Sequence, residues 1–285
     1  MVLGKNKKKY LKMNNKKDSL GDRMKEFYEN RAKTYLTRRT PVMIRLDGKA
    51  FHTFTRGFVK PFDIRLMEAM QETTLALCAN IQGCVFGYTQ SDEITLILVD
   101  YNTISTDAWF DYQVEKMCSI SAAMATLYFN RIFREKVEKF TNEHLKDITN
   151  PNFDEEFKKS IDKILKSYQR AVDKGALFDA RCFNLPISEV ANAVLWRQQD
   201  CTRNSISALA QAYFSHHELQ GKNTSKMQDM LMEKHGINWN DLSIVEKRGT
   251  SVIKDEDGKW FIDTEMPILK GEDRKYVESR IIFDN

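Results

Sequence analysis

Three carboxylates stand where extended runs of the sequence end or turn. Asp47 closes the apolar run 41–48, and Asp92 and Glu93 lie at the tight turn between the runs 84–90 and 93–99. In a sheet that places these runs side by side, Asp47 and Asp92 would project from one edge. Mg²⁺ prefers oxygen ligands, often one or two carboxylates with substrate phosphates, and paired acids can hold two ions about 3.5–4 Å apart. The pattern therefore indicates a two-metal phosphoryl-transfer site, with ordinary turn acids as the alternative.

The residues after Asp47 suit a phosphate. Gly48 would let the backbone approach a triphosphate, whose oxygens could accept from successive N–H groups. Five side chains that can carry positive charge lie between residues 45 and 65: Arg45, Lys49, His52, Lys60 and Arg65. An ordinary charged surface is the alternative. The chain has no G-x-x-x-x-G-K-[ST] run, so it is not a P-loop protein.

A third polar cluster lies in LWRQQDCTRNS, residues 195–205. On a helix, Arg197, Asp200, Arg203 and Asn204 fall at spacings of three and four and share one face. Composition favours an exposed, salt-bridged surface here over a buried polar site. His216 and His217 would point about 100° apart on a helix, which makes them a poor metal site.

The positioning elements follow from periodicity and turn residues. We expect strands at 41–48, 84–90, 93–99 and 177–184, and a terminal hairpin of TSVIK, the turn DEDG and KWFID. Helices are expected at 63–80, 107–140, 152–174, 187–219 and 225–235. This order begins like a split βαβ unit. The predicted fold class is α/β (α+β), with a ferredoxin-like core whose antiparallel sheet is flanked by long helices and followed by a C-terminal helical and hairpin extension.

Composition and charge restrict the class of protein. The chain has 285 residues, with 42% hydrophobic and 29% charged, which excludes fibrous, disordered and integral membrane proteins. Its net charge of +4 is uneven, because residues 1–17 hold seven lysines and no acid, and the remainder has 37 basic and 40 acidic residues. The charge of the body therefore gives no argument for nucleic-acid binding. We expect 1–18 to be a disordered basic extension, or an arm for RNA phosphates, and 19–285 to form one domain.

Cysteine usage and hydropathy indicate the compartment. The five cysteines form no C-x-x-C pair and suit neither a disulfide framework nor a zinc cage. The start lacks the apolar run of a secretory signal, and no stretch approaches the ~20 apolar residues of a membrane span. We expect a reduced, cytoplasmic protein without a membrane partner.

Five motifs, taken together, resemble one family. IRLDGKAFHTF (44–54), FVKPFD (58–63), YTQSDE (88–93), FDAR (178–181) and WRQQDCTRN (196–204) occur in the order of the tRNA-His guanylyltransferase superfamily, and the chain looks like its bacterial and archaeal branch. The resemblance spans about residues 19–255. It implies a domain similar to polymerase palms that extends RNA in the 3′-to-5′ direction. ATP or GTP activates a tRNA 5′ end, which the 3′-hydroxyl of a nucleoside triphosphate then attacks.

The resemblance also implies roles for particular residues. Asp47 and Asp92 would hold two Mg²⁺ ions with the Gly48 carbonyl, while Glu93 supports them and Ser91 shapes the turn. Nucleotide-binding positions would be Lys49, Ala50, Phe51 and His52, whose amides cradle a triphosphate, together with Lys60 and Asp63. The Asp63 carboxylate is chemically apt to accept from a guanine. Arg45, Lys116 and Asn204 match positions at the phosphates of the activating nucleotide, and further candidate contacts with RNA or phosphate are Arg197, Arg203 and Lys222.

Two departures from the family pattern bear on the substrate. Thr202 stands where the eukaryotic enzymes carry a histidine, and Gln113 stands where members often have an arginine. Thr202 favours template-dependent repair of 5′-truncated tRNA over the runner-up, addition of one guanosine to tRNA-His. Gln113 bears on which triphosphate activates best. Other classes are a palm-type nucleotide cyclase and a catalytically silent RNA-binding protein. We expect a homo-oligomer, a tetramer as in family members, because several subunits could pool charge for tRNA.

Overall fold

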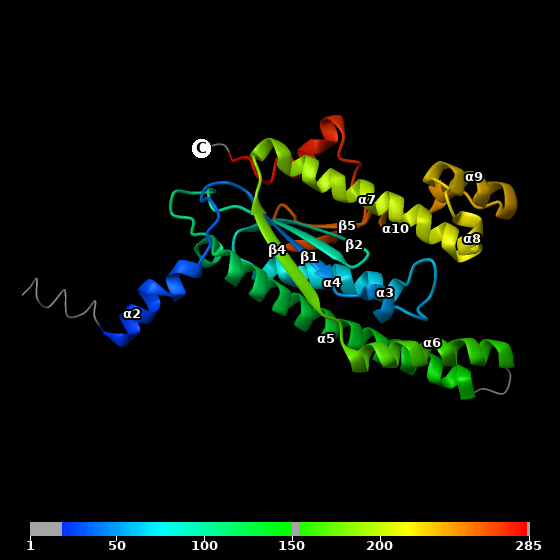
Figure 1. Cartoon of the computed structure of the whole chain (residues 1–285). Helices are drawn as coiled ribbons and strands as arrows, with labels where there is room; N and C mark the ends of the chain where they lie inside the picture. Colours follow the sequence, from blue (N-terminus) through cyan, green and yellow to red (C-terminus); the bar gives the residue numbers. More distant parts are fainter. Residues whose placement is uncertain (1–18, 150–153, 284–285) are drawn as a thin grey trace, which may run out of the picture.

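The computed structural model describes residues 19–149 and 154–283. Helices cover both faces of one antiparallel sheet (Figure 1). The expected disordered extension 1–18 lies outside the described residues, and the single domain over 19–285 stays a prediction. Within the described chain, no helix is long and apolar enough to span a membrane.

The sheet has the predicted ferredoxin-like order. Its strands are ordered β4-β1-β3-β2-β5-β6, and every pair is antiparallel. The bounds are β1 Val42–Gly48, β2 Cys84–Gln90, β3 Glu93–Leu98, β4 Phe178–Asn184, β5 Thr250–Lys254 and β6 Trp260–Asp263. Helix α4 (Ile64–Asn80) connects β1 to β2, and α5 (Val114–Thr149) and α6 (Glu155–Lys174) connect β3 to β4. The first four strands and these helices therefore form the split βαβ unit, and β5 and β6 extend it.

Alternation along β1 divides the molecule into two layers. Ile44 and Leu46 belong to the apolar cluster that includes residues of α4, α5 and α6. Met43 belongs to a second cluster, with residues of α7 (Ile187–Tyr213) and α11 (Lys275–Glu278). Arg45 and Asp47 follow Met43 at alternate positions, so they face α7. The polar site thus lies on the face of the sheet that α7 covers.

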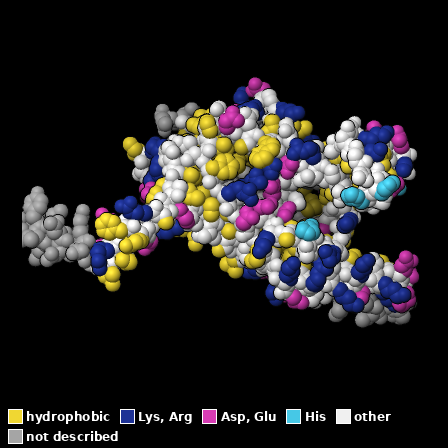
Figure 2. Space-filling view, viewed as in Figure 1, with side chains coloured by type: hydrophobic (Ala, Val, Ile, Leu, Met, Phe, Trp, Pro, Cys, Tyr) yellow, Lys and Arg dark blue, Asp and Glu magenta, His cyan; other side chains and the backbone are white. Residues whose placement is uncertain are grey.

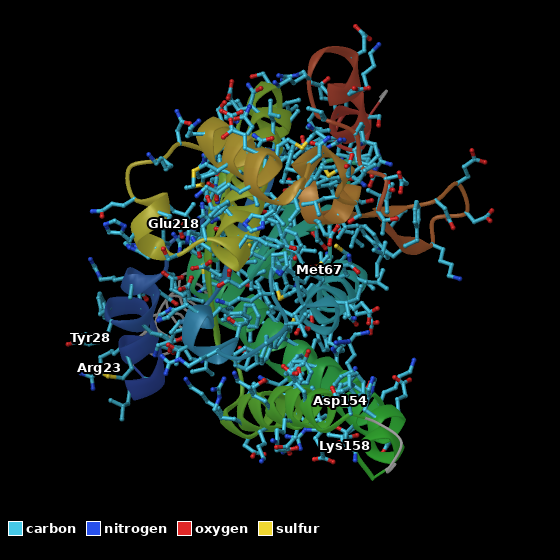
Figure 3. The ribbon with its side chains drawn as sticks, turned by 90° about the vertical axis from the view of Figure 1, so that its right-hand side faces the viewer. Arg23, Tyr28, Met67, Asp154, Lys158 and Glu218 are labelled. Atoms are coloured by element: carbon cyan, nitrogen blue, oxygen red, sulfur yellow. The ribbon has the colours of Figure 1, made fainter. Side chains whose placement is uncertain are left out.

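Two helical projections extend from the sheet. The first is the hairpin of α5 and α6, with Lys158 and Asp154 near its end (Figure 3). The second, which we call the helical lobe, consists of α8 (His216–Leu219), α9 (Thr224–His235), the 3₁₀ turn η3 (Trp239–Asp241) and the C-terminal part of α7, around a small apolar core of its own. Figure 2 shows open space between the two projections.

Short elements complete the chain. They are α2 (Leu20–Phe27), η1 (Glu29–Ala32), α3 (Phe51–Phe54), η2 (Trp109–Tyr112), α10 (Ile244–Arg248) and η4 (Gly271–Arg274). Apart from η2, which lies inside the helix expected at 107–140, none of these was expected from the sequence. Helix α3 follows β1 directly and α10 precedes β5, so both lie next to strands that form the site.

The boundaries of two expected helices were wrong. The helix expected at 107–140 begins at Val114, because Phe110, Asp111 and Tyr112 adopt positive φ and interrupt it, and it continues to Thr149. The helix expected at 187–219 ends at Tyr213. Ser215 then starts α8 with a capping box to Glu218, which satisfies the first amides of a new helix.

Candidate active site

Backbone pairing brings the three acidic positions together. Asp47 on β1 pairs with Glu93 on β3, and the Gly48 amide donates to the Asp92 carbonyl at 3.1 Å. Ser91 adopts a left-handed φ of 49° in the turn, and its hydroxyl donates to the Asp92 carboxylate at 3.0 Å. The end of β1 is therefore fixed against the β2–β3 turn, as the sequence predicts, with Ser91 shaping that turn.

The electrostatics of the pair suit a cation. Burial, followed by repulsion from Glu93 and Asp179, raises the pKa of Asp47. Burial also raises the pKa of Asp92, and repulsion from Asp47 adds to it, although the Ser91 hydroxyl acts in the opposite direction. Neither carboxylate forms an ion pair with a described basic side chain. A bound cation would relieve this repulsion.

The donor set matches Mg²⁺ better than a transition metal. Among the described residues, no group of three or more His, Cys, Asp or Glu side chains is placed to hold a metal ion. Two carboxylates from Asp47 and Asp92 leave coordination positions for phosphate oxygens, which is the usual arrangement for Mg²⁺, and the Gly48 carbonyl stays a predicted further ligand. These residues therefore fit the expected metal.

Glu93 is held by buried arginine rather than left free. The Arg197 guanidinium donates to both Glu93 oxygens, at 3.1 and 2.8 Å, and also pairs with Asp200 at 3.1 Å. Arg45 adds a longer ion pair to Glu93 at 3.5 Å. Arg197 is only 4% exposed, which corrects the expectation of an exposed face at this residue, whereas Arg203 and Asn204 of the same cluster are exposed. Arg197 is occupied in positioning Glu93, so it does not offer a contact to RNA.

The loop after β1 presents unpaired amides. A Cβ on Gly48 would lie 2.2 Å from the buried Phe51 ring, so this position requires glycine. Ala50 adopts a left-handed conformation before α3, and in the described chain the amides of Ala50, Phe51 and His52 have no acceptor. The Lys49 amide, in contrast, donates to the Leu177 carbonyl at 2.8 Å. Three of the four predicted cradle amides are available, and Lys49 can contribute its exposed side chain instead.

A cleft of about 540 Å³ opens in front of this loop. Gly48, Ser91 and Asp92 line one end of it, and His52, Lys60 and Asp63 line the remainder. Phe51, Phe54 and Phe58 pack against aromatic residues of α5 and hold the loop in place. The cleft lining therefore includes the Asp92 and Asp63 carboxylates together with the exposed side chains of His52 and Lys60.

Asp63 has a structural role that the sequence analysis did not foresee. It caps α4 by accepting from the amides of Arg65 and Leu66, and its second oxygen accepts from the Val59 amide and the Tyr168 hydroxyl. An ionised carboxylate has about four lone-pair sites, and these four bonds occupy them. A bond from Asp63 to a guanine would have to displace one of them.

The three residues expected at the activating nucleotide do not meet in one chain. Arg45 faces α7, and Asn204 on α7 lines a smaller cavity of about 200 Å³ that it shares with Ser91. Lys116 lies near the start of α5 on the opposite face of the sheet, since the neighbouring Cys118 lies 3.6 Å from Cys182 there. Lys116 therefore lies apart from Arg45 and Asn204 in the described chain, and the assignment of the three residues to the activating nucleotide stays a prediction.

The other candidate RNA contacts are exposed. Arg203 is exposed on α7 and pairs with Asp200. Lys222 is exposed between α8 and α9 in the helical lobe. Neither lies among the residues that line the cleft.

Comparison with known proteins places the chain in a family. Residues 21–186, more than half of the chain, match the family described as Thg1, tRNAHis guanylyltransferase. The chain belongs to the Thg1 family. The family resemblance and the nucleotidyltransferase class predicted from the motifs are thereby confirmed.

Solved structures of the Thg1 family share the fold. A bacterial Thg1-like protein in complex with ATP is 42% identical, with a TM-score of 0.77 over 93% of this chain and 100% of its own. A complex of such a bacterial protein with GTP is 39% identical, with a TM-score of 0.70 over 93% and 99% of the two chains. The tRNA(His) guanylyltransferase of Debaryomyces hansenii is 25% identical over 231 residues, 76% of this chain and 75% of the relative.

The sequence analysis missed two residues at this Thg1-family site. On β4, Asp179 lies opposite Asp47 and Arg181 lies opposite Arg45, so both face the site, and they form an ion pair at 3.3 Å. The signal was present in FDAR, because alternate positions of a strand share a face. Their exposed side chains extend the polar site to the edge of the sheet.

Proposed function

We propose that this Thg1-family member is a Mg²⁺-dependent, template-dependent 3′-5′ nucleotidyltransferase that repairs the 5′ end of truncated tRNA. The observation that carries the proposal is the unneutralised pair Asp47 and Asp92, of which Asp92 lines a cleft together with the loop of unpaired amides. The likeness to bacterial Thg1-like proteins in complex with ATP and GTP supports nucleotide substrates.

The chain's own groups account for binding and positioning. Bound at Asp47 and Asp92, Mg²⁺ would activate the attacking oxygen and neutralise charge on the leaving oxygens. The amides of Ala50, Phe51 and His52 would donate to the triphosphate oxygens, with the Lys49 and Lys60 side chains supplying positive charge. Arg197 and Arg45 hold the Glu93 side chain in place next to Asp47 and Asp92. Phosphoryl transfer needs mainly such positioning and charge stabilisation.

The proposed reaction has two transfers. The 5′-phosphate of the RNA attacks the α-phosphorus of ATP or GTP and releases pyrophosphate. The 3′-hydroxyl of a nucleoside triphosphate then attacks the 5′-phosphorus and displaces the nucleoside monophosphate. Base pairing with the opposite strand would select each added nucleotide, so side chains need not encode that choice.

Thr202 supports repair as the main role. Its hydroxyl donates to the carbonyls of Gln198 and Lys247, both at 3.1 Å, and so joins α7 to α10. Thr202 is thus used within the fold, in place of the histidine of the eukaryotic enzymes. The runner-up is addition of one guanosine to tRNA-His. It is favoured by the activity that names the Debaryomyces hansenii relative.

Three further features belong to the proposal. The substrate would be tRNA lacking 5′ nucleotides, bound by a homo-oligomer that we expect to be a tetramer. Because the body carries slightly more acidic than basic residues, charge pooled across subunits would help to hold tRNA. The cytoplasm, where tRNA and both triphosphates are present, is the proposed location.

The test uses a tRNA that lacks its first nucleotide and is labelled at its 5′-phosphate, beside full-length tRNA-His. Each is incubated with Mg²⁺, ATP and the four nucleoside triphosphates. Extension of the truncated tRNA by the templated nucleotide, ending at full length, would support repair. Preferential guanosine addition to full-length tRNA-His would support the runner-up. No transfer to either RNA would contradict both.

A further inference from the structure

A cavity of about 470 Å³ lies on the side of α7 that is turned away from the carboxylates. Arg197 faces Glu93, whereas Gln199 and Thr202, which project in other directions from the helix, line this cavity. Its remaining walls come from η3, from α10 and from residues 268–270. We call it the α7–α10 groove. It shares no lining residue with the cleft at Asp92.

The groove is positively charged. Its lining includes Arg203, Lys247, Arg248 and Lys270, and no Asp or Glu. Arg203 pairs with Asp200, but the other three form no ion pair with a described carboxylate. The chain beyond residue 17 has more acidic than basic residues, so this is a local excess of positive charge. Like charges held together without counter-charges favour binding of an anion.

The other groups of the groove suit nucleic acid. Trp239 is half-buried, and its indole N–H donates to Ser205 at 3.0 Å, so the ring is fixed. The Lys247 ammonium donates to the Asn240 carbonyl at 2.6 Å and lies 5.9 Å from the centre of the Trp239 ring. A basic groove with an ordered aromatic ring is the combination that binds single-stranded nucleic acid through phosphates and stacked bases.

The groove adjoins the proposed active site across one short helix. In α10, Val245 and Glu246 line the small cavity that also contains Ser91, and the next two residues, Lys247 and Arg248, line the groove. A single-stranded RNA segment leaving the proposed active site would therefore meet the groove after passing α10. We propose that the α7–α10 groove binds the phosphodiester backbone of a single-stranded RNA segment. The identity of that segment, the unpaired 3′ end of the substrate tRNA, rests on the proposed function.

The test measures binding without catalysis. Fluorescence anisotropy of a labelled single-stranded RNA of about eight nucleotides is recorded for wild type and for Lys247→Gln/Lys270→Ala. Lys270→Glu alone serves as a second variant, because the exposed Lys270 side chain has no described partner and its change leaves packing intact. The matched control is Lys139→Ala/Lys259→Ala, which removes the same charge at exposed positions outside the groove. ATP and inorganic phosphate are used as competitors.

We expect the double variant to bind about tenfold more weakly, with a salt dependence shallower by about 1.4, since each phosphate contact to a single strand contributes about 0.7 to the slope. The control should match wild type. Unchanged affinity in both groove variants would overturn the proposal. Competition by phosphate or ATP, with RNA affinity unchanged in the variants, would indicate a small-anion site instead.

A second measurement separates this proposal from the proposed function. Asp47→Ala, a variant of the carboxylate site, should retain the RNA affinity of wild type. If wild type binds RNA through the groove but transfers no nucleotide, the proposed function fails and the groove proposal stands. If groove variants repair tRNA with an unchanged KM, the groove proposal fails and the proposed function stands.

Discussion

At the scale of single residues, Asp47 and Asp92 are poorly neutralised, and the proposed function makes them the ligands of the metal. We predict that Asp47→Ala and Asp92→Ala each reduce transfer by about 10²-fold or more, since metal-held charge contributes several kcal/mol to such transition states. Transfer to truncated tRNA measures the effect, with circular dichroism to confirm the fold. Near-native transfer by either variant would refute the two-metal assignment.

The raised pKa of Asp92 gives a separate prediction about stability. Because its pKa is higher in the folded protein than in the unfolded chain, the folded state loses stability as pH rises through that interval. Without Mg²⁺, Asp92→Asn should therefore melt at a higher temperature than wild type at pH 7. The difference should vanish below the ordinary carboxyl pKa of about 3.9. Melting curves from pH 3 to 8 would test this, and a variant that is less stable than wild type at pH 7 would contradict it.

Arg197 should matter chiefly through Glu93. Arg197→Ala leaves the partly buried Glu93 with the longer Arg45 contact and a hydrogen bond from the Gln90 side chain. Breaking a buried ion pair typically costs about 3–5 kcal/mol. The double variant Glu93→Gln/Arg197→Met removes both charges and should be more stable than Arg197→Ala alone. Arg203→Ala is the exposed control and should cost at most about 1 kcal/mol. Urea unfolding provides the comparison, and a loss under 1 kcal/mol for Arg197→Ala would contradict its positioning role.

The sequence identified residue types at this site better than it identified their partners. Asp47, Gly48 and Asp92 were predictable because they follow strand and turn signals in the chain. The burial of Arg197 depends on which turn of α7 lies over β3. The contact between Arg197 and Glu93 joins residues 104 positions apart. The four bonds to Asp63 likewise involve Tyr168, far along the chain. Such tertiary partners leave no local pattern.

At the scale of elements, the strands and α4 were predictable, whereas the short helices were not. Alternation and the Ser91–Asp92 turn fixed β1, β2 and β3 within a residue or two. Helix α10 was missed although Ser243 and Glu246 form a capping box, a signal that S-x-x-E provides in the sequence. Phe110 and its neighbours adopt positive φ without any glycine, so the delayed start of α5 had no local signal.

The junction of β1 and α3 is the element on which nucleotide binding most depends. Gly48→Ala would place a methyl group against the Phe51 ring, and overpacking of this kind costs about 1–3 kcal/mol. We expect α3 to shift and affinity for ATP to fall. Gly21→Ala is the matched control, because nothing lies within 4 Å of its Cβ and alanine is favoured in a helix. Calorimetric ATP titration would test this, and unchanged affinity in Gly48→Ala would contradict it.

At the scale of the whole molecule, helix α2 buries none of its residues within the described part of the chain. Leu20, Met24, Phe27 and Tyr28 recur at helical spacing along α2 and its cap, and all are at least 45% exposed. Figure 1 shows α2 extending away from the sheet, and Tyr28 points outward in Figure 3. A helix of eight residues is marginal alone, and an exposed apolar stripe marks an interaction surface. We infer that α2 packs against another subunit.

Disrupting this stripe should change the mass in solution. We predict that wild type has a mass by light scattering several times the 33.3 kDa of one chain, and that Met24→Glu/Phe27→Glu reduces it. The fold should persist, because no residue of α2 is buried. Lys25→Glu, on the opposite side of the helix, should leave the mass unchanged. A wild-type monomer that still repairs tRNA would exclude both the oligomer and the need to pool charge, because one near-neutral chain would then hold the RNA unaided.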